Sequence, residues 1–376
     1  MTLSSKSRAL FILKYRANGP YGTWSYPPDA SGGTPAKLAN GLNISALQVV
    51  GMLNSVGIAA GQVHVVDNND IDREVTAFKP THVFIEAFWV VPEKFDILKK
   101  LHPGVTWIVR NHSKMDFLAA EGGAIGWGLD YIKKGVTLAC NSEEATRDFK
   151  ALAVSVGADP AKVICLPNFY NLPTRSTMSA SRLWSARMNR SWEFNPVFRK
   201  PLLSVGCFGA IRPLKNTLDQ AVGAILAADV LRVPLAFVIN GNRIEGGANS
   251  MHNAVKTLFA HHPKHQLVEL GWMEHDKFLD AVSSVDMVSQ VSSSETFNIV
   301  AADAVHQKVP VVGSAELPWL GKEFCANPGD VTDIRDKIVK VAHYMSTGAI
   351  QDEQYLTLQD YVQASQRAWI LYFAQH

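Results

Sequence analysis

Short apolar runs alternate with helical patterns along almost the whole sequence. In the first half the runs fall at residues 9–15, 63–67, 82–89, 106–110, 136–141 and 163–167, and the clearest helical patterns at 44–55, 92–101 and 142–156. Runs that are apolar at successive positions are typical of parallel strands covered on both faces. This alternation predicts an α/β fold with ligand-binding loops at the carboxyl ends of the strands.

The same alternation starts again in the second half. Strands are expected at 202–207, 235–240, 266–270, 286–291 and 309–312, and helices at 217–228, 249–262, 275–283, 296–306 and 331–344. The chain has 376 residues, which is too long for one core, because single cores stop growing at roughly 250–300 residues. We therefore expect two Rossmann-like, doubly wound domains, residues 1–172 and 201–352, with a last helix at about 353–376 that packs back on the first domain.

Composition narrows the class of protein. The chain is 47% hydrophobic and 19% charged, with a net charge of +2, which excludes a disordered chain and a uniformly basic one but leaves room for a local basic patch. No apolar run reaches the roughly 18–20 residues of a membrane span, and the N-terminal run is too short for a signal peptide. We expect a cytoplasmic protein whose four scattered cysteines are reduced.

The strongest local motif runs from Ser294 to Gly313. Glu295 and Asp303 are eight residues apart at the expected start of a helix, and eight residues return nearly the same side of a helix. Two carboxylates on one side can accept hydrogen bonds from neighbouring hydroxyls of a sugar or ribose. The alternative is that Glu295 caps the helix and Asp303 is solvated.

A glycine-containing turn follows the first strand of the second half. Gly209 precedes Arg212 and Lys215, and a helix begins shortly after them. Backbone N–H groups of such a turn and a helix N-terminus can approach a phosphate, and the two cations add positive charge at the same point. A tight loop with two solvated cations is the alternative for the turn taken alone.

These two motifs together resemble those of the retaining GT-B glycosyltransferases of the family-4 type, also called glycosyl transferases group 1. Glu295-x7-Asp303 followed by Val309-Pro310-Val311-Val312 is similar to the Glu-x7-Glu signature and its following strand. The resemblance implies two Rossmann-like domains facing a cleft. It implies that Arg212 and Lys215 hold the diphosphate of a nucleotide-sugar donor, most simply a UDP-sugar, with Glu295 on the sugar and Asp303 on the ribose.

Further residues extend the resemblance. It implies catalytic roles for Glu295, His112, Arg212 and Lys215. It implies that the donor is also bound by Gly33, Gly209, Gly241, Trp272, Met273, Phe297, Asn298 and Ile299. Each glycine here is also a plain turn residue, and His112 is alternatively a capping or core histidine. Glu86 lies inside an apolar strand, so it needs a buried partner; it is a candidate on the acceptor side.

Two patterns point to metal binding only superficially. Asp70-Ile71-Asp72 copies a metal-binding Asp-x-Asp, but we expect it in a solvated loop of the first domain. His261, His262 and His265 flank Pro263 at a helix end without a Cys or carboxylate at ligand spacing. We expect no metal requirement.

The segment 173–200 lacks strand or helix periodicity, so we expect it to be the linker. Six cations stand against one anion there, a local charge of 6 − 1 = +5, and four aromatic residues are interleaved with them. Arg182, Arg187 and Arg190 are therefore candidate acceptor contacts, because cations and aromatics suit a phosphodiester strand. An anionic glycan, or a packed and solvated linker, fits the same residues.

The sequence thus predicts a hexosyl- or pentosyltransferase. The acceptor would be a glycan or a hydroxylated base in DNA, as in phage-type DNA modification. A nucleotide-sugar 2-epimerase of the same fold and a non-catalytic two-lobe binding protein are the alternatives.

Overall fold

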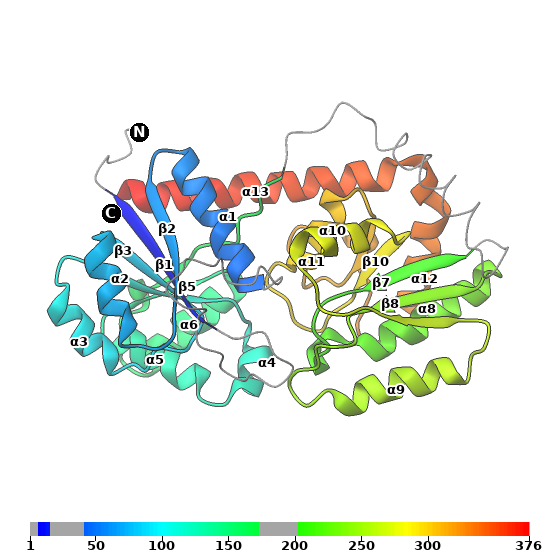
Figure 1. The fold of residues 1–376 in the computed structure, drawn as a ribbon, viewed down its shortest axis with the longest axis horizontal. Coiled ribbons are helices and arrows are strands. Elements are labelled where there is room, and N and C mark those ends of the chain that lie inside the picture. The colour runs from blue at the N-terminus through cyan, green and yellow to red at the C-terminus, as the bar shows by residue number, and fades with distance from the viewer. Residues whose placement is uncertain (1–6, 16–40, 173–201, 376) are drawn as a thin grey trace, which may run out of the picture. The chain divides into compact units, whose positions relative to one another are not determined.

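A computed structural model of the chain describes residues 7–15, 41–172 and 202–375 (Figure 1). They form two compact units. The first contains the described residues before Leu172 and those from Val362 onward, and the second runs from Leu172 to Tyr361. No helix in the described part of the chain combines the length and the apolar character needed to cross a membrane.

The first unit is built on a six-stranded parallel sheet. Its order is β2-β1-β3-β4-β5-β6. The strands are β1 (Arg8–Lys14), β2 (Ala59–Val65), β3 (His82–Glu86), β4 (Thr106–Asn111), β5 (Thr137–Cys140) and β6 (Val163–Cys165). The chain steps from β1 to β2 on one side and then to β3 on the other, so the strand order reverses beside β1, where doubly wound folds bind ligands.

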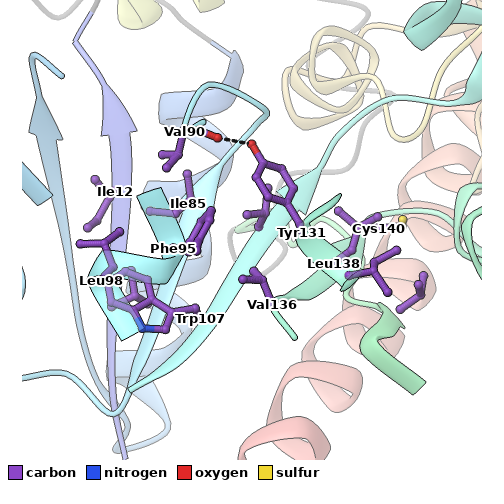
Figure 2. Close-up of a cluster of buried hydrophobic side chains, with 14 of the residues drawn as sticks. Ile12, Ile85, Val90, Phe95, Leu98, Trp107, Tyr131, Val136, Leu138 and Cys140 are labelled. Atoms are coloured by element: carbon purple, nitrogen blue, oxygen red, sulfur yellow. Dashed lines mark hydrogen bonds between the residues drawn. The ribbon is translucent and has the colours of Figure 1, made fainter. Parts of the chain in front are cut away.

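Helices connect these strands. They are α1 (Gly41–Ser55), α2 (Asp70–Phe78), α3 (Lys94–Leu101), α4 (Met115–Leu118), α5 (Ala124–Lys133) and α6 (Glu143–Ser155), with 3-10 turns at Ala119–Glu121 and Pro160–Lys162. Figure 2 shows part of the core that they bury. Phe95 meets both Trp107 and Tyr131 edge to face, with ring centroids 5.9 and 5.4 Å apart. The Tyr131 hydroxyl donates to the carbonyl oxygen of Val90, so its polar end is satisfied within the core.

The second unit contains a five-stranded parallel sheet in the order β11-β10-β7-β8-β9. The strands are β7 (Leu203–Cys207), β8 (Leu235–Ile239), β9 (Gln266–Glu269), β10 (Met287–Gln290) and β11 (Val311–Gly313). The helices are α8 (Thr217–Leu231), α9 (Asn249–Ala260), α10 (His275–Ser283), α11 (Ile299–His306) and α12 (Val331–Tyr344). Helix α13 (Ala349–Gln375) begins in this unit, and its residues from Val362 onward belong to the first unit. Short 3-10 turns lie at Pro213–Lys215, Lys322–Phe324 and Met345–Thr347. The α/β prediction is confirmed in both units.

Three local features differ from the sequence-based expectations. The Asp70-Ile71-Asp72 segment is not a loop but the first turn of α2, because Ile71 and Val75 are buried and Asp70 accepts the backbone N–H of Val66 (3.1 Å). Helix α5 is absent from the sequence-based prediction. Helix α11 begins at Ile299 rather than at 296, because Asn298 adopts a left-handed backbone (φ 61°) and caps the helix by accepting the N–H of Ala301.

The end of α13 fixes an aromatic cluster in the first unit. Trp369 is fully buried, and its ring lies 5.4 Å from Phe84 and 6.0 Å from Phe11. Its indole N–H donates to the carbonyl oxygen of Pro167 (2.8 Å), so the burial leaves no polar atom of the indole unpaired.

We expect Trp369→Ala to lower the free energy of unfolding by about 3–5 kcal/mol, because it empties a closely packed site and breaks a buried hydrogen bond. Leu371→Ala is the matched control, since Leu371 lies on the same helix and is 45% exposed; we expect it to change stability by no more than about 0.5 kcal/mol. Denaturant unfolding followed by fluorescence and circular dichroism measures both, and equal effects of the two variants would contradict the packing role of Trp369.

Candidate donor site

The turn after β7 brings backbone donors to the carboxyl edge of the second sheet. Gly206 must be a glycine, because a Cβ there would lie 2.3 Å from the ring of Phe208. Gly209 has φ +109°, a conformation that L-residues with a side chain rarely adopt. Its N–H donates to the side-chain oxygen of Asn240, 2.9 Å away in the loop after β8. The Phe208 carbonyl accepts from Gln290 of β10 (2.9 Å).

Arg212 belongs to a chain of charged contacts that continues into the loop after β8. The backbones of Ile211 and Ile244 form a parallel bridge, which places Glu245 beside Arg212. The Nε atom of Arg212 donates to Glu245 (2.7 Å), and Arg243 pairs with the other oxygen of the same carboxylate. The guanidinium of Arg243 lies 4.3 Å from the ring centre of Trp272.

Two arginines sharing one carboxylate have a clear electrostatic effect. Burial disfavours the charged form of Glu245, but the positive charges of Arg212 and Arg243 outweigh it and hold the pKa of the carboxyl below its ordinary value. The two guanidinium groups and the carboxylate together carry a net charge of +1. Each of the three side chains is about one-third exposed (30–32%).

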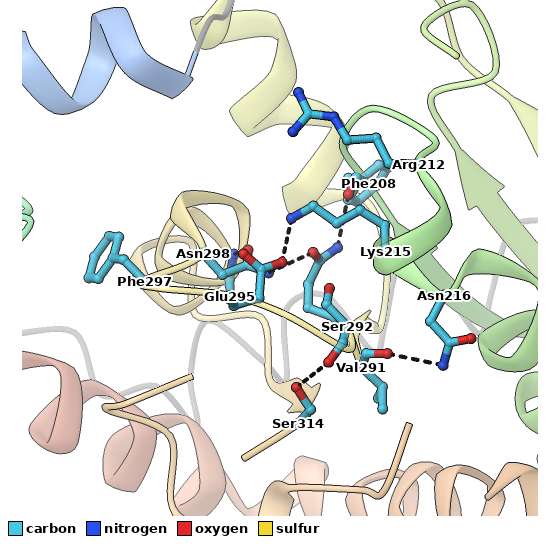
Figure 3. A network of polar contacts seen from close by, with 12 residues as sticks. Phe208, Arg212, Lys215, Asn216, Val291, Ser292, Glu295, Phe297, Asn298 and Ser314 are labelled. Carbon is cyan, nitrogen blue, oxygen red and sulfur yellow. Dashed lines mark hydrogen bonds and ion pairs between the residues drawn. The ribbon is translucent and has the colours of Figure 1, made fainter. Parts of the chain in front are cut away.

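Lys215 and Glu295 form the second charged contact of the site (Figure 3). The lysine Nζ donates to Glu295 Oε1, which also accepts from Asn298 Nδ2 (3.0 Å). Asn298 in turn reaches Gln290 Oε1 (2.9 Å). Asn298, and not Glu295, therefore caps helix α11. The Glu295 carboxylate is instead oriented by two donors, Lys215 and Asn298.

The predicted alignment of Glu295 and Asp303 on one helix face is not found, because Glu295 precedes the helix. Asp303 lies within α11, and its side chain is only 2% exposed. Its Oδ2 atom lies 3.1 Å from Nε2 of His275, the first residue of α10. This hydrogen bond, together with the negative charge of Asp303, raises the pKa of His275 against the opposing effect of burial.

The remaining predicted donor residues lie around these contacts. Gly241 follows β8, and a Cβ there would lie 2.3 Å from a carboxylate oxygen of Glu269, so a larger residue would require the Glu269 side chain to move. Trp272 and Met273 form the turn between β9 and α10. The Phe297 side chain is buried, stacked 5.5 Å from Tyr361. Ile299 begins α11. Gly33, Arg182, Arg187 and Arg190 lie outside the described residues, and their roles stay predictions.

In the first unit, Glu86 and His112 meet at the carboxyl ends of β3 and β4. Glu86 is fully buried and accepts from Arg110 Nη1 (2.8 Å) and His112 Nε2 (2.6 Å). Arg110 is buried as well and donates to Asn168 (3.1 Å), which also accepts from the Ser45 hydroxyl (3.0 Å). The partner that a buried glutamate requires is thus Arg110, which the sequence analysis did not identify.

The charges of this cluster decide its protonation. Burial alone would raise the pKa of Glu86, but Arg110 and the hydrogen bond from His112 lower it below its ordinary value. Burial and the charge of Arg110 lower the pKa of His112. His112 is therefore neutral near pH 7, donates Nε2–H to Glu86 and carries an acceptor lone pair on Nδ1.

The histidines that could suggest a metal have other contacts. His262 bonds to the carbonyl oxygen of Leu258 (2.7 Å), and buried His265 accepts the N–H of Leu235 (3.2 Å). His265 is thus a core residue, not one of the C-terminal charges of α9. Among the described residues, no group of three or more His, Cys, Asp or Glu side chains is arranged to hold a metal ion.

No family model matches the chain, and no curated protein matches it. Solved structures do. The UDP-forming α,α-trehalose-phosphate synthase of Burkholderia vietnamiensis superposes with a TM-score of 0.64 at 10% identity, covering 98% of this chain and 97% of that one. Sucrose-phosphate synthase of Thermosynechococcus elongatus gives a TM-score of 0.64 at 13% identity, with coverage of 97% and 98%.

An Escherichia coli structure described as trehalose-6-phosphate bound with UDP-2-fluoro glucose gives a TM-score of 0.61 at 9% identity, covering 98% of this chain and 99% of that one. The chain has the GT-B fold. At these identities the likeness shows the fold alone, so the roles of site residues have to be argued from their own contacts.

Sequence reasoning missed four polar residues of the candidate site in the second unit: Asn240, Arg243, Glu245 and His275. The signal for the first three was present, since Asn240-Gly241-Asn242-Arg243-Ile244-Glu245 directly follows a buried strand. Asn240, Glu245 and His275 have partners that are 28 to 33 residues away, and no spacing rule identifies such pairs.

We expect Arg110→Met to lower the free energy of unfolding by about 3–5 kcal/mol, because it leaves the Glu86 carboxylate buried without its main counter-charge. Arg147→Met is the control, since Arg147 pairs with Asp148 while 74% exposed. Adding Glu86→Gln to Arg110→Met should restore part of the loss.

The cluster of Glu86, Arg110 and His112 should also affect how the stability of the protein depends on acid pH. A carboxyl whose folded pKa is lowered stabilises the fold above its unfolded pKa, and this contribution is lost as the pH falls through the folded value. Wild-type stability should therefore decline more steeply than that of Glu86→Gln below about pH 4.5. Parallel stability curves of the two proteins from neutral to acid pH would contradict this role of Glu86.

Proposed function

We propose that the protein is a glycosyltransferase that moves a sugar from a nucleoside-diphosphate donor to an acceptor hydroxyl with retention of the anomeric configuration. The single observation that carries the proposal is the placement of Lys215 against Glu295, with Arg212 three residues away in a glycine-containing turn. Cations for a diphosphate and a carboxylate for sugar hydroxyls then lie together at the carboxyl edge of one parallel sheet.

The chemistry follows from charge. As the bond between the anomeric carbon and the diphosphate breaks, negative charge develops on the leaving oxygen. Arg212 and Lys215 are oriented before the reaction, so they stabilise this charge with little rearrangement. We infer that the chain's own cations neutralise the leaving group and that Glu295 orients the sugar.

The nucleotide of the donor and the role of each unit form part of the proposal. The structural neighbours include a UDP-forming synthase and a complex with UDP-2-fluoro glucose, which favours a UDP-sugar. We assign the donor to the second unit and the acceptor side to the first, where Glu86 and His112 remain candidate residues.

We expect Lys215→Met and Glu295→Gln each to reduce kcat at least about 100-fold, the size of effect seen when one oriented charge partner is removed from a transition state. Arg335→Met and Asp336→Asn are matched controls, because they break an ion pair (2.7 Å) on the surface of α12. Thermal-shift screening of nucleotide sugars first identifies the donor, and product analysis then measures transfer.

Three outcomes of this experiment separate the alternatives. Full activity of both site variants would refute the site. An epimer formed from the donor alone would instead indicate a 2-epimerase. Donor stabilisation without any turnover would indicate a binding protein.

The acceptor proposal rests on sequence alone. We propose a hydroxylated base in DNA or a glycan, and the +5 charge of residues 174–200 with its aromatics favours DNA. Reversing Arg182, Arg187 and Arg190 to Glu should abolish DNA binding at low salt, and the wild-type affinity should fall steeply as salt increases. Binding that survives the triple reversal would exclude DNA recognition by this segment and leave the glycan.

A further inference from the structure

We propose that His275, rather than Asp303, contacts the ribose of the nucleotide donor, and that Asp303 is a positioning residue that holds the imidazole. This inference rests on the proposed nucleotide donor and names the specificity-determining group of that same site. It departs from the role that the Glu295-x7-Asp303 motif implied for Asp303.

Asp303 itself is poorly placed to meet a ligand. Its side chain is 2% exposed, and its Oδ2 atom already lies 3.1 Å from Nε2 of His275. An aspartate is also one methylene shorter than the glutamate of the motif it resembles. A carboxylate that is buried and hydrogen-bonded in this way orients its partner more readily than it reaches outward.

His275 has the reach and the hydrogen-bonding capacity that Asp303 lacks. Its side chain is 27% exposed, and within the described residues its Nδ1 atom has no hydrogen-bond partner. An ionised carboxylate only accepts, so Nε2 carries a proton toward Asp303. Nδ1 then accepts when the imidazole is neutral and donates when it is protonated. A hydroxyl group can do both, so it suits Nδ1 in either state.

The position of His275 matches the middle of a nucleotide. On one side, His275 lies three residues after Trp272, whose ring is covered by the guanidinium of Arg243. On the other side its imidazole lies nearly parallel to Phe278 (6.4 Å, 24°), which meets Phe208 edge to face (5.6 Å) directly before Gly209. In a nucleoside diphosphate the ribose lies between the base and the phosphates. If the turn at Trp272 holds the base and the turn at Gly209 holds the diphosphate, a group between these two turns faces the ribose.

The test compares ribonucleotides with deoxyribonucleotides. Whichever of UDP, GDP, ADP and CDP binds most tightly is measured by calorimetry beside its 2′-deoxy and 3′-deoxy forms, using the full chain. We expect wild type to prefer the ribonucleotide over at least one deoxy form by about tenfold, the effect of one lost hydrogen bond of roughly 1.4 kcal/mol. His275→Phe keeps a ring of similar shape but should bring this ratio to about one.

Variants of His275 and Asp303 distinguish the two assignments, because each assignment predicts a different variant to lose the preference for the ribonucleotide. If Asp303 were the ribose ligand, His275→Phe would release its carboxylate and leave the ratio unchanged or higher, which would overturn the proposal. Asp303→Asn can still accept from Nε2–H, so we expect it to keep most of the wild-type ratio. Loss of the ratio in Asp303→Asn together with its survival in His275→Phe would also overturn the proposal.

Two controls keep the result interpretable. The double variant His275→Phe/Asp303→Leu replaces the buried pair with apolar groups, so it should fold even if His275→Phe alone does not, and we expect its ratio to be about one. His343→Gln changes an exposed histidine on α12 and should leave the ratio unchanged. Wild type that binds none of the four nucleotides would refute the proposed function itself, whereas tight binding with an unaltered ratio in the His275 variants would refute only this inference.

Discussion

The donor-side site depends on β7 lying between β8 and β10 with all three strands parallel. Parallel register puts the carboxyl ends of the three strands at one edge, so the loops that follow them meet there. Gly209 follows β7, Asn240 follows β8, and Glu295 follows β10. The hydrogen bonds from Gly209 to Asn240 and from Gln290 to Phe208 then join the loops to one another.

The loops so joined hold their cations against carboxylates. Lys215 is paired with Glu295, and Arg212 and Arg243 share Glu245. The diphosphate of the proposed donor would meet side chains that are already oriented, which reduces the entropy lost on binding.

The sequence predicted the elements far better than their contacts. Helices at 275–283 and 331–344 were expected with the bounds that the structure has, because each carries a clear helical period. Helix α2 was missed because Asn68, Asn69 and Asp70 are typical turn residues, whereas here they precede and begin a short helix. The pairing of Lys215 with Glu295, 80 residues apart, follows from sheet topology and has no local signal.

The pair of His275 and Asp303 explains why a motif alone assigns roles imperfectly. Spacing places a carboxylate on α11, but the length of the side chain and its neighbours decide which atom reaches a ligand. A glutamate has one more methylene and reaches farther from the helix, whereas the carboxylate of Asp303 is hydrogen-bonded to the imidazole of His275. Under the proposed assignment, the contact with the ribose belongs to His275, the first residue of α10, which lies 28 residues earlier and outside the motif. Residue roles in a divergent GT-B chain therefore have to be derived from the contacts that each side chain makes.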